Sequence, residues 1–146
     1  MCFLLFAGTD KPLPRKTWVK EVPDVYVQSL REYDAAISRH FSKPEVQQIG
    51  STSGCGCDFP HVMYQNGGWP RLNDVEIDQE WEETKRFNRE ALVGLLRSTG
   101  EDVVELYGVW AGDFEEEPKH REDVSLDRIL DSDFYFKEQG IVRILL

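Results

Sequence analysis

The sequence predicts a single α+β domain, residues 1–146, in which a mixed or antiparallel β-sheet packs against one long helix. Its 146 residues suit one compact domain. Apolar residues spaced by four indicate a helix from about Asp74 to Thr99. The predicted strands cluster before and after this helix. Because they do not alternate strictly with helices, the order favours an α+β domain over a doubly wound one.

The first predicted strand is the continuous apolar run Cys2–Ala7, which Gly8-Thr9-Asp10 follows. A run without alternation is typical of a strand that is buried on both faces, so we expect it in the middle of the sheet. Lys11-Pro12-Leu13-Pro14 follows as an extended connection, because proline lacks the N–H that a helix interior needs.

Three elements are expected next, followed by a long loop. Val25–Val27 indicates a short strand, Arg31–Phe41 has helical content and ends before Pro44, and Glu45–Gly50 indicates another strand. The next 18 residues, numbers 51–68, are rich in Gly and Ser and show no periodicity. Loops of that length in a compact domain are often functional or mobile.

Acidic residues crowd the first turns of the long helix and arginines lie later, an order that complements the helix dipole. Gly100 is placed to end the helix in the left-handed conformation. Val103–Trp110 then predicts a strand and Phe114–Asp123 a charged connector, while Val124–Ile129 fits either a strand or a short helix. Phe134–Phe136 and the C-terminal run 141–146 predict a closing β-hairpin.

The charge balance restricts the partners. The net charge is −10 and no basic patch offsets it, so neither nucleic acid nor an anionic membrane surface is expected to bind. No run approaches the roughly 18 apolar residues that span a bilayer. An odd number of cysteines without a signal peptide predicts free thiols and a cytoplasmic location. A protein partner or a small molecule remains compatible with the charge.

The three cysteines carry the densest reactive chemistry. Cys55 and Cys57 are separated by one glycine, and Cys2 begins the first strand. With His61 they supply three sulfurs and one nitrogen, a ligand set that zinc favours, although the usual zinc spacing places two to four residues between the thiols. We therefore take Cys2, Cys55, Cys57 and His61 as candidate metal ligands and zinc as the candidate cofactor.

Other interpretations of the cysteine pair stay open. A disulfide between Cys55 and Cys57 would be strained and hence oxidising. One thiolate would act as a nucleophile if His61 or His40 served as its base. Alternatively, two free thiols simply pack a glycine-rich turn. Convergence of all three sulfurs requires the first strand to neighbour the strand that precedes the loop, with Cys2 at the end that faces the loop.

Two resemblances begin at Met1-Cys2. A Met-Cys start followed by a strand is similar to amidohydrolases of the N-terminal nucleophile class, which implies catalysis by Cys2 once Met1 is removed. That start, with Lys11-Pro12-Leu13-Pro14, His40–Pro44 and Gly50–Cys57, resembles a group of small bacterial proteins over roughly the first 60 residues. This second resemblance implies a bacterial cytosolic origin and no mechanism.

Three classes of function follow from the sequence. The general expectation is a small acidic binding or interaction module in the bacterial cytosol. The more specific alternative is a cysteine-based site at Cys55 and Cys57 with Cys2, for zinc or for thiol redox chemistry. The third is an N-terminal-cysteine amidohydrolase.

Overall fold

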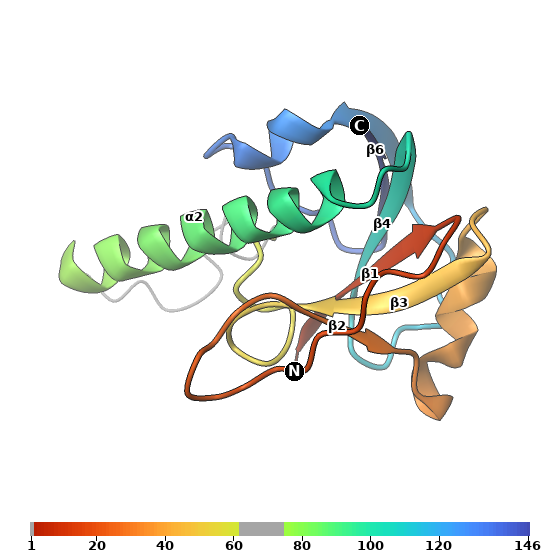
Figure 1. Cartoon of the computed structure of the whole chain (residues 1–146), viewed down its shortest axis with the longest axis horizontal. Coiled ribbons are helices and arrows are strands. Elements are labelled where there is room, and N and C mark those ends of the chain that lie inside the picture. The colour runs from red at the N-terminus through yellow and green to blue at the C-terminus, as the bar shows by residue number, and fades with distance from the viewer. Residues whose placement is uncertain (1, 62–74) are drawn as a thin grey trace.

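The computed structural model describes residues 2–61 and 75–146, with the side chains of 75–81 left out, and contains one six-stranded sheet (Figure 1). The strand order is β2-β3-β1-β4-β6-β5, and only the β5–β6 pair is parallel. The strands are β1 (Phe3–Thr9), β2 (Tyr26–Ser29), β3 (Glu45–Gly50), β4 (Val103–Trp110), β5 (His120–Ser125) and β6 (Gly140–Leu145). The predicted α+β class with a mixed sheet is confirmed.

Strand β1 is an interior strand and is buried along its whole length, as its unbroken apolar run predicted. Its side chains alternate between two hydrophobic clusters, one on each face of the sheet. Phe3, Leu5 and Ala7 belong to the larger cluster, and Leu4 and Phe6 belong to the smaller one. A strand with two apolar faces has no solvent face, which explains the absence of alternation in its sequence.

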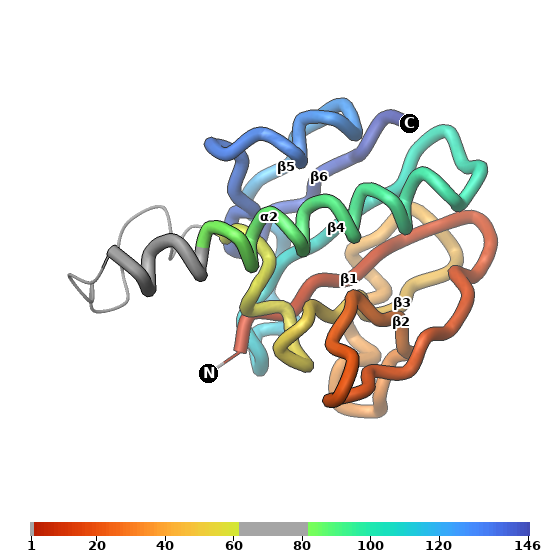
Figure 2. The backbone as a smooth tube through the Cα atoms, turned by 60° about the vertical axis from the view of Figure 1, so that its left-hand side comes forward, coloured from red at the N-terminus to blue at the C-terminus, as the bar shows by residue number. Residues whose placement is uncertain are grey.

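Helix α2 (Val75–Arg97) covers the larger cluster with Leu92, Val93 and Leu96, all buried. Figure 2 shows this helix running across β1 and β4. The long helix predicted from about Asp74 to Thr99 is therefore present, and Asp74 itself lies outside the described residues. Gly100 follows with φ +71°, the left-handed conformation expected at the end of a helix.

The opposite face of the sheet is covered by η1 (Glu32–His40), a 3₁₀ helix where the sequence predicted helical content. Its Ile37 is fully buried in the smaller cluster, beside Phe6 and Tyr107. His40 is buried as well, and its Nε2 lies 2.9 Å from the carbonyl oxygen of Phe114. The two helices bury the central strands from both faces. This leaves the ends of the sheet for polar side chains.

The C-terminal third differs from its prediction in two places. The expected connector includes the edge strand β5, whose charged side chains fit a strand that is largely exposed. The ambiguous segment holds the end of β5 and then the 3₁₀ helix η2 (Leu126–Leu130). The predicted hairpin is wrong, because β6 pairs with β4 and β5, and Phe136 pairs instead with His61. The Phe136 amide donates to the carbonyl of Pro60 at 2.8 Å.

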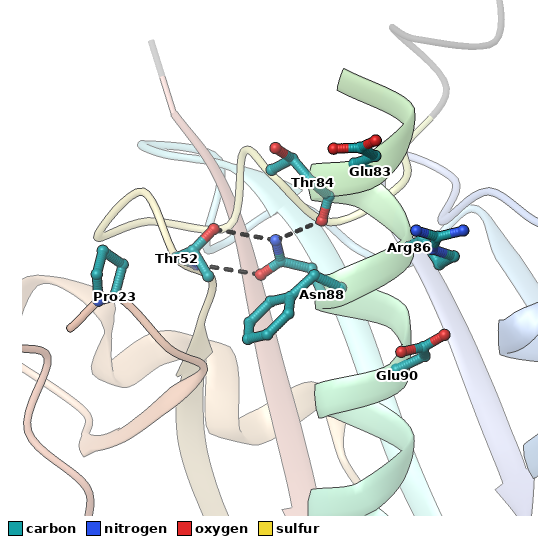
Figure 3. Close-up of a pocket in the computed structure, with 8 residues that line it drawn as sticks. Pro23, Thr52, Glu83, Thr84, Arg86, Asn88 and Glu90 are labelled. Carbon is teal, nitrogen blue, oxygen red and sulfur yellow. Dashed lines mark hydrogen bonds between the residues drawn. The ribbon is translucent and has the colours of Figure 1, made fainter. Parts of the chain in front are cut away.

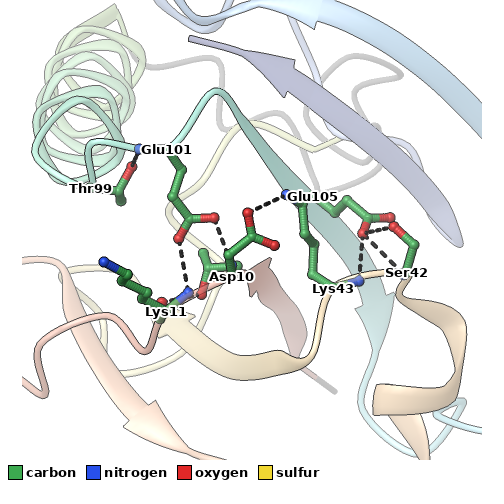
Figure 4. A network of polar contacts seen from close by, with 8 residues as sticks. Asp10, Lys11, Ser42, Lys43, Thr99, Glu101 and Glu105 are labelled. Atoms are coloured by element: carbon green, nitrogen blue, oxygen red, sulfur yellow. Dashed lines mark hydrogen bonds and ion pairs between the residues drawn. The ribbon is translucent and has the colours of Figure 1, made fainter.

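A polar network ties the end of β1 to the starts of β3 and β4 (Figure 4). Oε1 of the buried Glu105 accepts hydrogen bonds from the Ser42 amide at 3.0 Å, the Ser42 hydroxyl at 2.6 Å and the Lys43 amide at 3.0 Å. The half-buried Glu101 accepts from the Asp10 amide at 2.6 Å through its carboxylate. These bonds fix the end of the sheet that lies opposite Cys2.

Within the described residues, no helix combines the length and the apolar character that crossing a membrane requires.

Candidate thiol site

The antiparallel pairing of β1 with β3 places the start of one strand beside the end of the other. Leu5 pairs with Ile49, so the chain before Leu5 runs alongside the chain that leaves β3 at Gly50. Cys2 precedes β1, and the loop that carries Cys55 and Cys57 follows β3. The neighbouring strands that convergence of the cysteines requires are therefore present.

The loop Ser51–Asp58 folds back on itself immediately after β3. The Ser51 amide donates to the Cys55 carbonyl at 2.6 Å, and the Gly54 amide donates to the Ser51 carbonyl at 3.1 Å. Gly54 adopts φ +84°, which a side chain would strain. The hydroxyl of Ser51 also donates to the Cys55 carbonyl. These bonds close a tight turn, after which the chain comes back beside the start of β1.

Gly56 allows the loop to touch the backbone of β1. Its amide donates to the Phe3 carbonyl at 2.9 Å, and a Cβ at this position would lie only 2.6 Å from the same oxygen. Only glycine fits such an approach without movement of the backbone. Glycine between the two cysteines therefore serves contact with β1, and Cys55 and Cys57 lie on either side of that contact.

Three side chains from other parts of the fold hold this loop. Trp18 Nε1 donates to the Thr52 carbonyl at 3.1 Å, and the Tyr26 hydroxyl donates to the Gly54 carbonyl at 2.6 Å. The fully buried Asn88 of α2 accepts from the Thr52 amide at 3.1 Å and donates to the Thr52 hydroxyl at 3.0 Å. The loop thus has a fixed shape, although no helix or strand runs through it.

The sulfur atoms of Cys2, Cys55 and Cys57 all lie within 4.8 Å of one another. None of the three forms a disulfide; Cys2 is exposed, while Cys55 and Cys57 are half-buried. The carbonyl of Cys2 accepts a hydrogen bond from the Ala111 amide at 2.8 Å, which holds the residue beside the end of β4. Three sulfurs with one exposed member form a site that solutes can reach.

Hydrogen-bond donors gather around the sulfur of Cys55. The Cys57 amide and the Ser53 hydroxyl each lie 3.4 Å from it. The pKa of Cys55 is lowered to about 5, mainly by a hydrogen bond from the Cys57 thiol. Hydrogen bonds from the Ser53 hydroxyl, the Cys57 amide and the Cys2 thiol lower it further, whereas burial raises it. Cys55 therefore gives up its proton more readily than an ordinary cysteine.

Cys57 titrates in the opposite direction. Its hydrogen bond to the Cys55 sulfur holds the proton on Cys57 and raises its pKa, and burial adds to this effect. Cys57 packs against the larger hydrophobic cluster, whereas Cys55 packs against the smaller one. The pair therefore straddles the end of the sheet, and Cys55 is the member that ionises first.

His61 lies beside the thiol site and outside the group of three sulfurs. Its buried ring stacks on Phe3 with 4.6 Å between ring centroids and meets Trp110 edge-on at 5.6 Å. Burial is the main cause that lowers the pKa of His61 to about 4, while a backbone hydrogen bond with Cys57 opposes it. The imidazole is therefore neutral at pH 7 and packs beneath the Cys57 side of the site.

Several residues that shape the site were not singled out from the sequence. Ser53 lies two residues before Cys55 in the Ser-Gly-Cys-Gly-Cys segment, and its hydroxyl lies beside the Cys55 sulfur. Its position so close to the cysteine in the sequence could have identified it as part of the site. Tyr26, Trp18 and Asn88 reach the loop from distant parts of the chain. No local pattern marks such anchors, because their role depends on tertiary packing.

Comparisons with protein-family models, curated proteins and solved structures give no match for this chain. The chemistry of the thiol site therefore carries the functional assignment.

Proposed function

We propose that the protein binds one thiophilic transition-metal ion, with zinc as the first candidate, through the sulfurs of Cys2, Cys55 and Cys57. The observation that carries this proposal is the approach of all three sulfurs to within 4.8 Å of one another. Sulfurs that share one zinc ion lie about 2.3 Å from it, so they are roughly 3.8 Å apart in a tetrahedral site. A small contraction of the cluster would reach that geometry.

The surroundings of the sulfurs support the same proposal. Thiolates are soft ligands, and a set of three favours zinc or copper(I) over magnesium or calcium. The Ser53 hydroxyl and the Cys57 amide, each 3.4 Å from the Cys55 sulfur, would offset part of the charge of a thiolate cluster. The Gly56 contact with Phe3 fixes the backbone between two of the ligands.

Zinc titration of the reduced protein tests this proposal. We expect one zinc per chain, and we expect each of Cys2→Ser, Cys55→Ser and Cys57→Ser to weaken binding by at least about tenfold, because each removes one of three ligands. Ser53→Ala removes a neighbouring donor and should have a smaller effect. Retention of full affinity by all three cysteine variants would contradict the proposal.

A second candidate function is thiol–disulfide exchange, which the donor-rich surroundings of the Cys55 sulfur favour. In this reaction the Cys55 thiolate attacks a small disulfide, forms a mixed disulfide and releases one thiolate. A second thiol of the cluster loses its proton and attacks the Cys55 sulfur, which closes an internal disulfide and releases the second thiolate. The protein is oxidised by two electrons, and the small disulfide is reduced to two thiols.

Oxidised glutathione separates the two candidates. Redox function predicts a mixed disulfide and then a protein lighter by two hydrogens in intact mass, with Cys55→Ser inert. Metal function predicts that bound zinc protects the thiols from this reaction. Three thiols that remain free after long exposure to oxidised glutathione without zinc would exclude the redox candidate.

A further inference from the structure

A groove lies between helix α2 and the loops that face it, separate from the three sulfurs. It has a volume of about 500 Å³ and is lined by side chains of α2 between residues 83 and 90 together with Pro23 and Thr52 (Figure 3). Ligand sites in proteins commonly measure about 300–1,000 Å³. The groove is therefore large enough for a small molecule.

The polar floor of the groove is rigid and internally satisfied. Asn88 accepts from the Thr52 amide at 3.1 Å, and its amide group donates to the Thr52 hydroxyl at 3.0 Å and to the Thr84 carbonyl at 2.8 Å. Figure 3 shows the two bonds that join Asn88 to Thr52 in the loop and the one bond to Thr84 within α2. Because Asn88 and the Thr52 amide bond to each other, these groups define the shape of the groove. A ligand would be recognised by the side chains of the walls and rim.

The walls offer apolar surface. Phe87 of α2 is 49% exposed, although an aromatic side chain of that size is usually buried, and Pro23 lies in the facing loop. Val22, beside Pro23, is 73% exposed. A half-exposed aromatic ring in a groove is a surface on which a flat apolar group or a cation can lie.

The rim carries more negative than positive charge. Glu83 lies four residues before Phe87 and Glu90 lies three residues after it, so both flank the ring on the same side of the helix. Arg86 also lines the groove, which leaves a net charge of −1 on the rim. Among the described residues, none of the ion pairs involves Glu83, Arg86 or Glu90.

We propose that this groove binds a small organic cation, an ammonium group carried on an apolar or aromatic body. The apolar part lies on the ring of Phe87, and the ammonium faces the carboxylates of Glu83 and Glu90. An anion of the same shape is disfavoured by these carboxylates and by the net charge of −10 on the whole chain. This assignment does not depend on metal binding.

A pair of probes with opposite charge tests the assignment. The ¹⁵N-labelled protein is titrated with phenethylamine and, separately, with 3-phenylpropionate, and amide shifts are followed by NMR. We expect saturable shifts with the amine at amides of residues 83–90 and at Thr52. We expect no saturable shift there with the carboxylate.

Variants of exposed residues identify the groups that bind. Phe87→Ala should weaken amine binding by about fivefold or more through loss of the aromatic surface. The double variant Glu83→Gln with Glu90→Gln should weaken it by roughly threefold to tenfold, whereas Arg86→Gln should strengthen it. Glu32→Gln, an exposed carboxylate on η1 across the sheet, is the matched control and should leave binding unchanged.

Three results would overturn the assignment. They are the absence of saturable shifts in the groove with phenethylamine, equal binding of the carboxylate, and undiminished amine binding in the Phe87→Ala protein. The amide spectrum of each variant reports whether it is folded, so a loss of binding can be separated from a loss of structure.

Discussion

At the scale of single residues, the thiol site depends on a glycine whose role is steric. Gly56 approaches the Phe3 carbonyl so closely that a Cβ would lie 2.6 Å from the oxygen. The same contact carries the 2.9 Å hydrogen bond from the Gly56 amide. One missing methyl group therefore permits the approach that brings Cys55 and Cys57 to Cys2.

Substitution of this glycine should separate the loop from β1. We expect Gly56→Ala to lower the free energy of unfolding by about 1–3 kcal/mol, because backbone must move to relieve the overlap. Gly94→Ala is the matched control, since a Cβ there meets no atom within 4 Å and alanine favours the helix by about 1 kcal/mol. Urea denaturation measures both. Equal stability of Gly56→Ala and the parent protein would contradict the close approach.

A buried tyrosine makes stability depend on alkaline pH. Burial is the main cause that raises the pKa of Tyr107 to about 12, and its hydroxyl donates to the Glu116 carbonyl at 3.2 Å. An unfolded tyrosine loses its proton near pH 10, so between about pH 10 and 12 the folded state holds more protons. The stability that Tyr107 contributes is therefore complete below pH 10 and is lost as the pH rises toward 12.

The free energy of unfolding should fall by up to about 2–3 kcal/mol over this range, because the folded and unfolded pKa values of Tyr107 differ by about two units at 1.36 kcal/mol each. Urea denaturation at several pH values measures it. Tyr107→Phe should show a correspondingly shallower decline above pH 10, since its ring cannot ionise. Parallel declines in the two proteins would show that Tyr107 does not carry the alkaline sensitivity.

At the scale of elements, both ends of the central strand are fixed by polar contacts of different kinds. The loop Ser51–Asp58 holds the start of β1 through the backbone hydrogen bond from Gly56 to Phe3, and Glu105 on β4 holds the segment that leads into β3. The buried carboxylate of Glu105 substitutes for water at two amides and one hydroxyl. Such a group is costly to remove, because its donors are left without an acceptor.

Removal of this carboxylate should weaken the sheet at that end. We expect Glu105→Ala to cost about 2–4 kcal/mol and Glu105→Gln about 1 kcal/mol, since the amide oxygen keeps part of the bonding. Glu101→Ala, which removes the acceptor of the Asp10 amide at a less buried position, should cost less than Glu105→Ala. Thermal and urea denaturation give the comparison. A smaller loss for Glu105→Ala than for Glu101→Ala would refute this ranking.

Periodicity predicted most of the elements, because each depends on local sequence. The strands β1, β3 and β4 and helix α2 carry their own apolar patterns, and all were predicted close to their observed bounds. The predicted hairpin failed because Phe134–Phe136 has the aromatic composition of a strand, while Phe136 pairs with His61 through a non-local contact. Strand β5 was missed because its charged edge sequence shows little apolar alternation.

The candidate site was predictable only in part. The cysteine pair indicated which loop to examine, and Cys2, the remaining cysteine, was the candidate third sulfur. The β1–β3 register places the three sulfurs close together. His61 is close to the cysteines in sequence, but its ring stacks on Phe3 and lies outside the group of sulfurs. Closeness in sequence alone therefore does not identify a ligand. The anchors Trp18 and Asn88 reach the loop only through tertiary packing.

At the scale of the whole molecule, the proposed metal would join two segments that are 53 residues apart in sequence, Cys2 and Cys55. Such a link would tie the beginning of the chain to the loop after β3 and restrict the unfolded state as a cross-link does. Metal binding should therefore stabilise the fold and reduce opening of the sheet at this end.

Zinc should raise the thermal midpoint of the reduced protein by roughly 5–10 °C at a hundredfold excess over the dissociation constant, which corresponds to about 2.7 kcal/mol. Hydrogen exchange at the amides of Gly56 and Ala111 should slow at the same time, since they donate to the carbonyls of Phe3 and Cys2. Cys2→Ser should abolish most of both effects. A thermal midpoint that zinc leaves unchanged would count against the link.

X-ray absorption at the zinc edge of the zinc-loaded, reduced protein tests the central claim most directly, because it counts the sulfur atoms bound to the ion. We predict three sulfur neighbours at about 2.3 Å, and two in the Cys2→Ser protein. A zinc ion surrounded only by oxygen and nitrogen, or a spectrum that Cys2→Ser leaves unchanged, would contradict the three-sulfur site.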